Sequence, residues 1–181
     1  MARADRFILL PMLAALAACG GGDAAAPGDH GTPPPQASAL ERAAIASGAI
    51  ADPRAISPVG LYQRPHEAGR DLLCLIPGPA QKPYRFGMEA VFGTEQSCRG
   101  EGTARRAGDK LILHFSGRSG CIVVADYEGD RIALPGVVDM ACDALCSGRG
   151  SLAGVSLPRI GNDPRAAAVA TDRRGGTLCG G

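Results

Sequence analysis

Six cysteines lie between residues 74 and 179, and this even set constrains the fold more than any other feature of the sequence. They are Cys74, Cys98, Cys121, Cys142, Cys146 and Cys179. In a chain that folds in an oxidising compartment, such a set predicts three disulfides, whose connectivity the spacing does not specify. We therefore expect a small domain in which cross-links supplement the hydrophobic core, typically by about 2–4 kcal/mol each.

The first 18 residues have the layout of an export signal. Arg3 and Arg6 give a basic start, and an apolar run follows over residues 7–16. This run is too short to span a bilayer, and Pro11 within it disfavours a permanent membrane helix. Residues 1–18 are therefore predicted to be a signal peptide that is removed on export.

The apolar run ends in Leu16-Ala17-Ala18-Cys19, which resembles the lipobox of bacterial lipoproteins. The resemblance implies that Cys19 becomes the first residue of the mature chain and carries a covalently attached lipid, the only cofactor that we expect. It also implies a membrane as partner, because two or three acyl chains anchor a protein stably. By analogy with enteric bacteria, Gly20 favours the outer membrane, with the domain facing the periplasm. The alternative is an ordinary secretory signal followed by an incidental cysteine.

Charge and aromatic content argue against some classes of partner. Removing residues 1–18 removes Arg3, Arg6 and Asp5, which leaves 17 of the 19 basic and 17 of the 18 acidic residues and a formal net charge of zero. With no basic excess to neutralise phosphates, nucleic acid is not an expected partner. The chain has no tryptophan and few other aromatic residues, so a platform for stacking sugars or bases is not expected either.

Composition divides the chain into five segments, of which the second is too rich in Gly, Ala and Pro to bury a core. They are a signal peptide (1–18), a disordered tether (19–37), a short helix with a connector (38–56), an antiparallel β domain (57–160) and a tail with a short helix (161–181). Ser38 and Glu41 fit a capping box for the first helix. Leu40 either docks this helix onto the domain, or the helix is merely the end of the tether.

Alternating apolar and polar residues predict strands through the β domain. The clearest piece is a hairpin over residues 98–115 that turns at Ala107-Gly108. Its register places small side chains opposite large ones on the inward face: Ala104 opposite Leu111, Gly102 opposite Leu113 and Gly100 opposite Phe115. A second hairpin is predicted over 121–134, with Val123 opposite Leu134 and Ala125 opposite Ile132.

The remaining elements are short. A closing strand is predicted over 151–157, and short helices over 139–146 and 163–170. The predicted fold class is mainly β: a small antiparallel β-barrel or sandwich with short helices, stapled by disulfides.

Cys142 and Cys146 form the sharpest candidate for chemistry, because a helix would place both thiols on one face. A thiol-redox pair is one interpretation, although the spacing differs from Cys-x-x-Cys; the favoured one is two structural half-cystines with different partners. No set of four ligands for zinc is apparent, so no metal is expected. His114 is expected opposite Glu101 on the solvated face, and His66 in a loop.

The β domain resembles the small β-barrel protease inhibitors of bacterial envelopes over residues 58–134. Gly60 and Tyr62 stand for the opening Gly-x-Trp motif of that family, with tyrosine in place of tryptophan. The resemblance implies a disulfide between Cys74 and Cys98, and an N-terminal arm that enters a protease cleft. In this chain that arm would be the lipid tether.

No catalytic constellation is apparent in the sequence, so we expect the protein not to be an enzyme. The expected function is that of a bacterial envelope lipoprotein with a non-catalytic binding or structural β domain. An envelope protein is a candidate partner. The alternatives are an inhibitor of an envelope protease or other hydrolase, and a thiol-redox protein that uses Cys142 and Cys146.

Overall fold

The computed structural model describes residues 38–81, 83–117 and 120–179. The predicted signal peptide, the lipidated Cys19 and the tether lie outside these residues. The described chain from Ser38 onward belongs to one compact unit.

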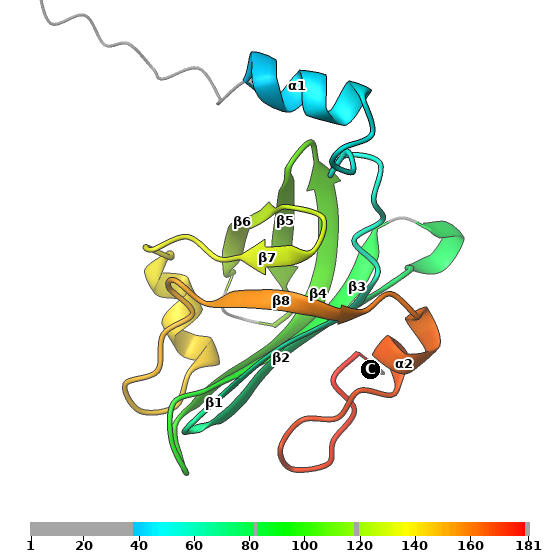
Figure 1. Ribbon diagram of the computed structural model, residues 1–181. Helices are drawn as coiled ribbons and strands as arrows, with labels where there is room; N and C mark the ends of the chain where they lie inside the picture. The colour runs from blue at the N-terminus through cyan, green and yellow to red at the C-terminus, as the bar shows by residue number, and fades with distance from the viewer. Residues whose placement is uncertain (1–37, 82, 118–119, 180–181) are drawn as a thin grey trace, which may run out of the picture. The chain divides into compact units, whose positions relative to one another are not determined.

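Eight antiparallel strands form a closed barrel, in which each strand pairs with its neighbours in sequence and β1 pairs with β8 (Figure 1). The strands are β1 (Gly60–His66), β2 (Gly69–Ile76), β3 (Tyr84–Val91), β4 (Ser97–Ala107), β5 (Lys110–Phe115), β6 (Ile122–Tyr127), β7 (Arg131–Ala133) and β8 (Ser156–Gly161). The helices are α1 (Ala39–Ala46), η1 (Pro79–Gln81), η2 (Met140–Leu145) and α2 (Pro164–Ala168). The prediction of a mainly β, disulfide-stapled fold is confirmed. Of the two predicted architectures, barrel and sandwich, the barrel is correct.

The barrel is filled by its own side chains. In β3 the alternation predicted from the sequence directs Phe86, Met88 and Ala90 into the interior, where each is at most 1% exposed. Phe86 meets Phe115 of β5 edge to face, with ring centroids 4.9 Å apart. Eight strands enclose a space just wide enough for side chains. In this barrel the side chains of the main core cluster occupy that space.

The predicted hairpin over residues 98–115 is correct in its faces and wrong in its register. Ala104 lies opposite Leu113 and Gly102 opposite Phe115, a shift of two residues, because the turn falls at Gly108-Asp109. Gly108 has φ 64°, which glycine adopts without strain. The second hairpin is shifted in the same way, since Ile132 lies opposite Tyr127 rather than Ala125.

The six cysteines form three disulfides whose sequence spans are nested within one another. They are Cys74–Cys179, Cys98–Cys146 and Cys121–Cys142, with separations of 105, 48 and 21 residues. The Cys74–Cys98 disulfide implied by the resemblance to protease inhibitors is therefore wrong. Because Cys142 and Cys146 bond to different partners, their interpretation as structural half-cystines is confirmed.

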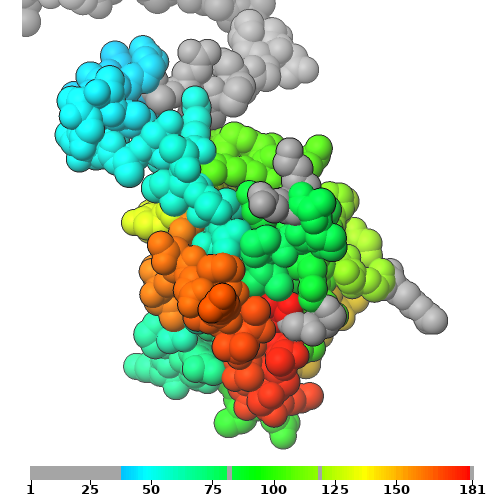
Figure 2. Space-filling view, turned by 90° about the vertical axis from the view of Figure 1, so that its right-hand side faces the viewer, coloured from blue at the N-terminus to red at the C-terminus, as the bar shows by residue number. Residues whose placement is uncertain are grey.

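The predicted tail packs on the outer face of β2 and β3. Figure 2 shows this orange-to-red segment lying against the green strands. Its apolar residues join those of β2 in a second buried cluster, with Leu178 only 1% exposed. Leu178 lies over Gly87 of β3, where a β-carbon would be 1.8 Å from the Leu178 carbonyl oxygen. The tail therefore fits only because this position is glycine.

The short elements agree with the sequence in part. The Ser38 side chain accepts the Glu41 N–H at 3.0 Å, as the capping box predicts. Leu40 is 80% exposed and does not dock α1 onto the domain, whereas Ala44 and Ile45 of the same helix are half-buried. The closing strand begins at Ser156, not at residue 151, because residues 153–154 form a turn. None of the helices in the described ranges has the length and apolar character needed to cross a membrane.

Candidate functional site

The two histidines of the barrel have different surroundings. His114 is exposed and lies opposite Thr103, not Glu101, because of the shifted register. His66 belongs to β1, not to a loop, and its Nε2 is 3.1 Å from Asp71 Oδ1. The fully buried Asp71 also accepts the Arg64 guanidinium at 2.6 Å and the Val91 N–H at 2.8 Å. This cluster satisfies a buried carboxylate and ties three strands together.

No group of three or more His, Cys, Asp or Glu side chains suited to hold a metal occurs among residues 38–81, 83–117 and 120–179. The remaining candidate sites act through shape and charge.

One end of the barrel is closed by the backbone of residues 53–58, held by a set of side chains that we call the mouth clamp: Tyr62, Arg106, Tyr127 and Arg159. Arg106 donates to the carbonyls of Pro53 and Ile56, both at 2.6 Å. Arg159 donates to the Ser57 carbonyl at 2.7 Å and to the hydroxyls of Tyr62 at 2.7 Å and Tyr127 at 2.5 Å.

The electrostatics of the mouth clamp keep its two tyrosines protonated, so that their hydroxyls can donate hydrogen bonds to the backbone. Burial raises the pKa of both Tyr62 and Tyr127, although the charge of Arg159 opposes the shift. The tyrosines therefore stay protonated, and Tyr62 donates to the Pro58 carbonyl at 2.7 Å. A pocket of 490 Å³ opens beside the clamp, lined by Arg159, Asn162, Tyr84 and apolar side chains. The three acceptors of Arg159 are uncharged and are all bound by Nη2, whereas its Nε is buried with no hydrogen-bond partner among the described residues, so the pocket keeps the positive charge of this arginine.

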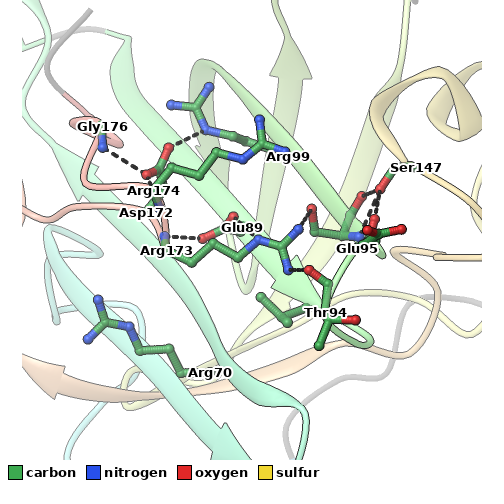
Figure 3. Close-up of polar contacts among 12 residues, drawn as sticks. Arg70, Glu89, Thr94, Glu95, Arg99, Ser147, Asp172, Arg173, Arg174 and Gly176 are labelled. Carbon is green, nitrogen blue, oxygen red and sulfur yellow. Dashed lines mark hydrogen bonds and ion pairs between the residues drawn. The ribbon is translucent and has the colours of Figure 1, made fainter.

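A second hollow lies between the tail and the barrel wall, and we call it the arginine cleft. It has a volume of 370 Å³ and is lined by Glu89, Ser97, Arg99, Leu145, Cys146, Ser147, Asp172 and Arg174. Figure 3 shows these polar groups converging from β3, from β4, from Ser147 beyond η2 and from the tail. Two disulfides, Cys98–Cys146 and Cys74–Cys179, join these segments covalently. The cleft is therefore held in shape before any ligand arrives.

Both carboxylates of the arginine cleft are nearly buried and already satisfied. Glu89, 4% exposed, accepts the Arg173 N–H at 2.9 Å and has the Arg173 guanidinium nitrogen at 3.7 Å. Asp172, 7% exposed, accepts the N–H groups of Arg174 and Gly176, both at 2.8 Å, and pairs with Arg99 Nε at 3.0 Å. Burial opposes ionisation of Asp172, but these N–H donors and the arginine charge outweigh it and lower its pKa.

The arginines are not all satisfied in the same way. Arg173 donates to the carbonyls of Gly93 and Thr94 at 2.9 and 3.0 Å as well as facing Glu89. A second guanidinium nitrogen of Arg99, Nη2, donates to the Thr177 carbonyl at 3.3 Å. The Arg174 guanidinium has no hydrogen bond or ion pair to any residue within the described ranges, and in Figure 3 it extends alongside Arg99. The cleft thus holds one cation whose donors are unused.

The sequence reasoning did not identify this site. By strand alternation Arg99 belongs to the solvated face of its hairpin, and Arg173-Arg174 forms part of no recognisable motif. One signal was available: Glu89 interrupts the apolar run of β3, and a carboxylate placed among buried residues requires a cationic partner. Nothing in the sequence places residues 172–174 beside β3 and β4.

Comparison with known proteins gave no relative: no protein-family model, curated protein or solved structure matches the chain.

Proposed function

We propose that this protein is a lipid-anchored component of the bacterial envelope and that its β-barrel domain binds another envelope component without catalysing a reaction. Support for the location comes from the lipobox-like Leu16-Ala17-Ala18-Cys19 and from three disulfides, which form in oxidising compartments. In this proposal Cys19 carries the lipid, the anchor lies in the outer membrane, and the barrel faces the periplasm.

The observation that favours binding over a purely structural role is the uncommitted guanidinium of Arg174. The other charged groups of the arginine cleft are tied into its walls, whereas Arg174 contributes nothing to them through its side chain. Arg174 is exposed beside a hollow whose walls are already formed, so its own side chain is the part of the site that a ligand has to order. A guanidinium with free donors is suited to bind an anionic group.

Affinity capture from solubilised envelopes tests the binding role. The wild-type chain is compared with Arg174→Gln and with Arg165→Gln, which removes an exposed arginine of α2. We expect one component to be retained by the wild type and by Arg165→Gln and lost with Arg174→Gln. Equal retention by all three proteins would show that the arginine cleft is not the binding surface.

The anchor is tested separately, by fractionation of cells that express Cys19→Ala. We expect this variant in the soluble fraction and the wild type in the membrane fraction. Retention of the variant in the membrane would refute lipidation at Cys19.

Inhibition of an envelope hydrolase is the second candidate function. The eight-stranded antiparallel barrel favours it, because this is the architecture that the resemblance to small β-barrel inhibitors implies. The disulfide pattern does not follow that family. A hydrolase recovered by affinity capture should lose activity in proportion to added protein; an unchanged hydrolase activity would leave only the binding role.

A further inference from the structure

We infer that the arginine cleft recognises a peptide carboxylate, either a C-terminal carboxylate or that of an acidic side chain. This inference rests on the proposed function, since it takes the cleft to be the binding surface, and it names the chemistry that the cleft selects.

The charge balance of the cleft calls for an anion. The lining of the cleft carries two guanidinium groups, those of Arg99 and Arg174, and two carboxylates, those of Glu89 and Asp172. A third guanidinium, that of Arg173, lies outside the lining and pairs with Glu89. The N–H donors and Arg99 lower the pKa of Asp172 and so favour its ionised form. One guanidinium charge is therefore left without a carboxylate partner among the described residues, although the predicted mature chain as a whole has no net charge. This charge is that of Arg174, whose guanidinium donors are free of bonds to the described residues.

The size of this excess favours a singly charged group. A carboxylate neutralises the one remaining positive charge. A phosphate dianion would bring a second negative charge close to two nearly buried carboxylates, and like charges at such distances repel. The planar fork of a guanidinium also matches a carboxylate with two parallel hydrogen bonds. Arg174 has this fork available, and Arg99 adds positive charge beside it.

The rest of the lining favours a peptide end over a larger ligand. The Ser147 hydroxyl is engaged with the carbonyls of Glu95 and Ser97, at 3.0 and 3.2 Å, so it is not free to donate to a ligand. Leu145 and the Cys98–Cys146 disulfide provide an apolar wall next to the guanidinium groups. A hollow of 370 Å³ is at the small end of the ligand pockets found in proteins, roughly 300–1,000 Å³.

NMR titration of the purified, disulfide-bonded chain tests this assignment, with the arginine side-chain resonances as readout. The probes are acetyl-trialanine with a free C-terminal carboxylate, the same peptide as its C-terminal amide, acetyl-Ala-Glu-Ala-amide, and inorganic phosphate. We expect the Arg174 and Arg99 resonances to shift with a free-carboxylate peptide and not with the amide. The trialanine and glutamate peptides distinguish a C-terminal from a side-chain carboxylate.

Two substitutions of Arg174 distinguish the effect of its charge from that of its planar guanidinium group. Arg174→Gln should weaken carboxylate binding on the order of tenfold or more, the usual effect of losing a charge-assisted hydrogen bond. Arg174→Lys keeps the charge without the fork and should recover only part of the affinity. Arg165→Gln should bind as the wild type does, which controls for a general loss of positive charge.

Each outcome is decisive for the inference. Phosphate binding without carboxylate binding overturns the assignment of ligand class, and equal binding by Arg174→Gln overturns the site. If no carboxylate binds while capture from envelopes still depends on Arg174, the inference fails and the proposed binding function stands. If neither depends on Arg174, both fail.

Discussion

Gly87 of β3 lies directly beneath the tail, and its replacement by alanine tests how the tail is attached. The new β-carbon would lie 1.8 Å from the Leu178 carbonyl oxygen and 2.5 Å from its carbonyl carbon. These are backbone atoms, which cannot rotate away as the end of a side chain can. The next residue, Cys179, is bonded to Cys74 on β2. The tail must therefore lift off between its disulfide and α2.

The cost follows from what Leu178 loses. Its side chain is 1% exposed, and returning a buried leucine to water costs about 1.5–3 kcal/mol. Its N–H donates to the Ala170 carbonyl at 2.8 Å, a bond that contributes about 1 kcal/mol net. We expect Gly87→Ala to lower the free energy of unfolding by roughly 2–4 kcal/mol.

Urea denaturation of the oxidised protein measures this change, and hydrogen exchange of residues 171–178 locates it. Gly136→Ala is the matched control, because its β-carbon would meet no atom within 4 Å, and it should change stability by less than about 0.5 kcal/mol. Gly87→Ala should also weaken carboxylate binding, since the displaced tail carries Asp172 and Arg174. If Gly87→Ala behaves as the control does in both assays, the packing of the tail described above is wrong.

Three further predictions concern other parts of the molecule. Arg106→Gln removes donors to two backbone carbonyls and should destabilise the barrel by about 1.5–3 kcal/mol in urea denaturation, whereas the exposed Arg105→Gln should have little effect. The folded protein lowers the pKa of Asp172 from 3.8. Its contribution to stability is therefore complete above about pH 4 and is lost as the pH falls through the folded-state pKa. In that pH range hydrogen exchange of the tail should rise for the wild type, and Asp172→Asn should show no such dependence. Replacing Cys121 and Cys142 together by alanine should cost about 3 kcal/mol, as expected for a loop of 21 residues; thermal unfolding that matches the wild type would contradict this.

The sequence was sufficient to predict which face each strand residue takes. In β4 and β5 the inward set was predicted correctly, but the partners were displaced by two residues, so that Ala104 meets Leu113 rather than Leu111. A register shift of two residues leaves every side chain on the same face of the sheet, so the hydrophobic pattern cannot distinguish the two registers. Only a shift of one residue would expose the core. The turn decides between such registers, and Gly108 allowed more than one turn.

The arginine cleft lay beyond prediction for a different reason. Its charged groups are contributed by β3, β4 and the tail, and Glu89 is 84 residues from Arg173, whose N–H it accepts. Periodicity describes contacts within a strand or hairpin, whereas this contact depends on where the tail is fastened. That location follows from the Cys74–Cys179 disulfide, one of several pairings that the cysteine spacing allows.

The nested arrangement of the three disulfides has a consequence for how the protein is made. Cys74 leaves the ribosome long before its partner Cys179, which follows it by 105 residues. Cys98 and Cys121 follow Cys74 in the chain and bond to neither it nor each other in the native protein. An oxidase that joins cysteines in order of appearance would therefore produce a Cys74–Cys98 bond, a trapped species. Maturation then requires that oxidation wait until the chain is complete, or that a disulfide isomerase exchange the early bond. We expect yields in an oxidising host to depend on such an isomerase.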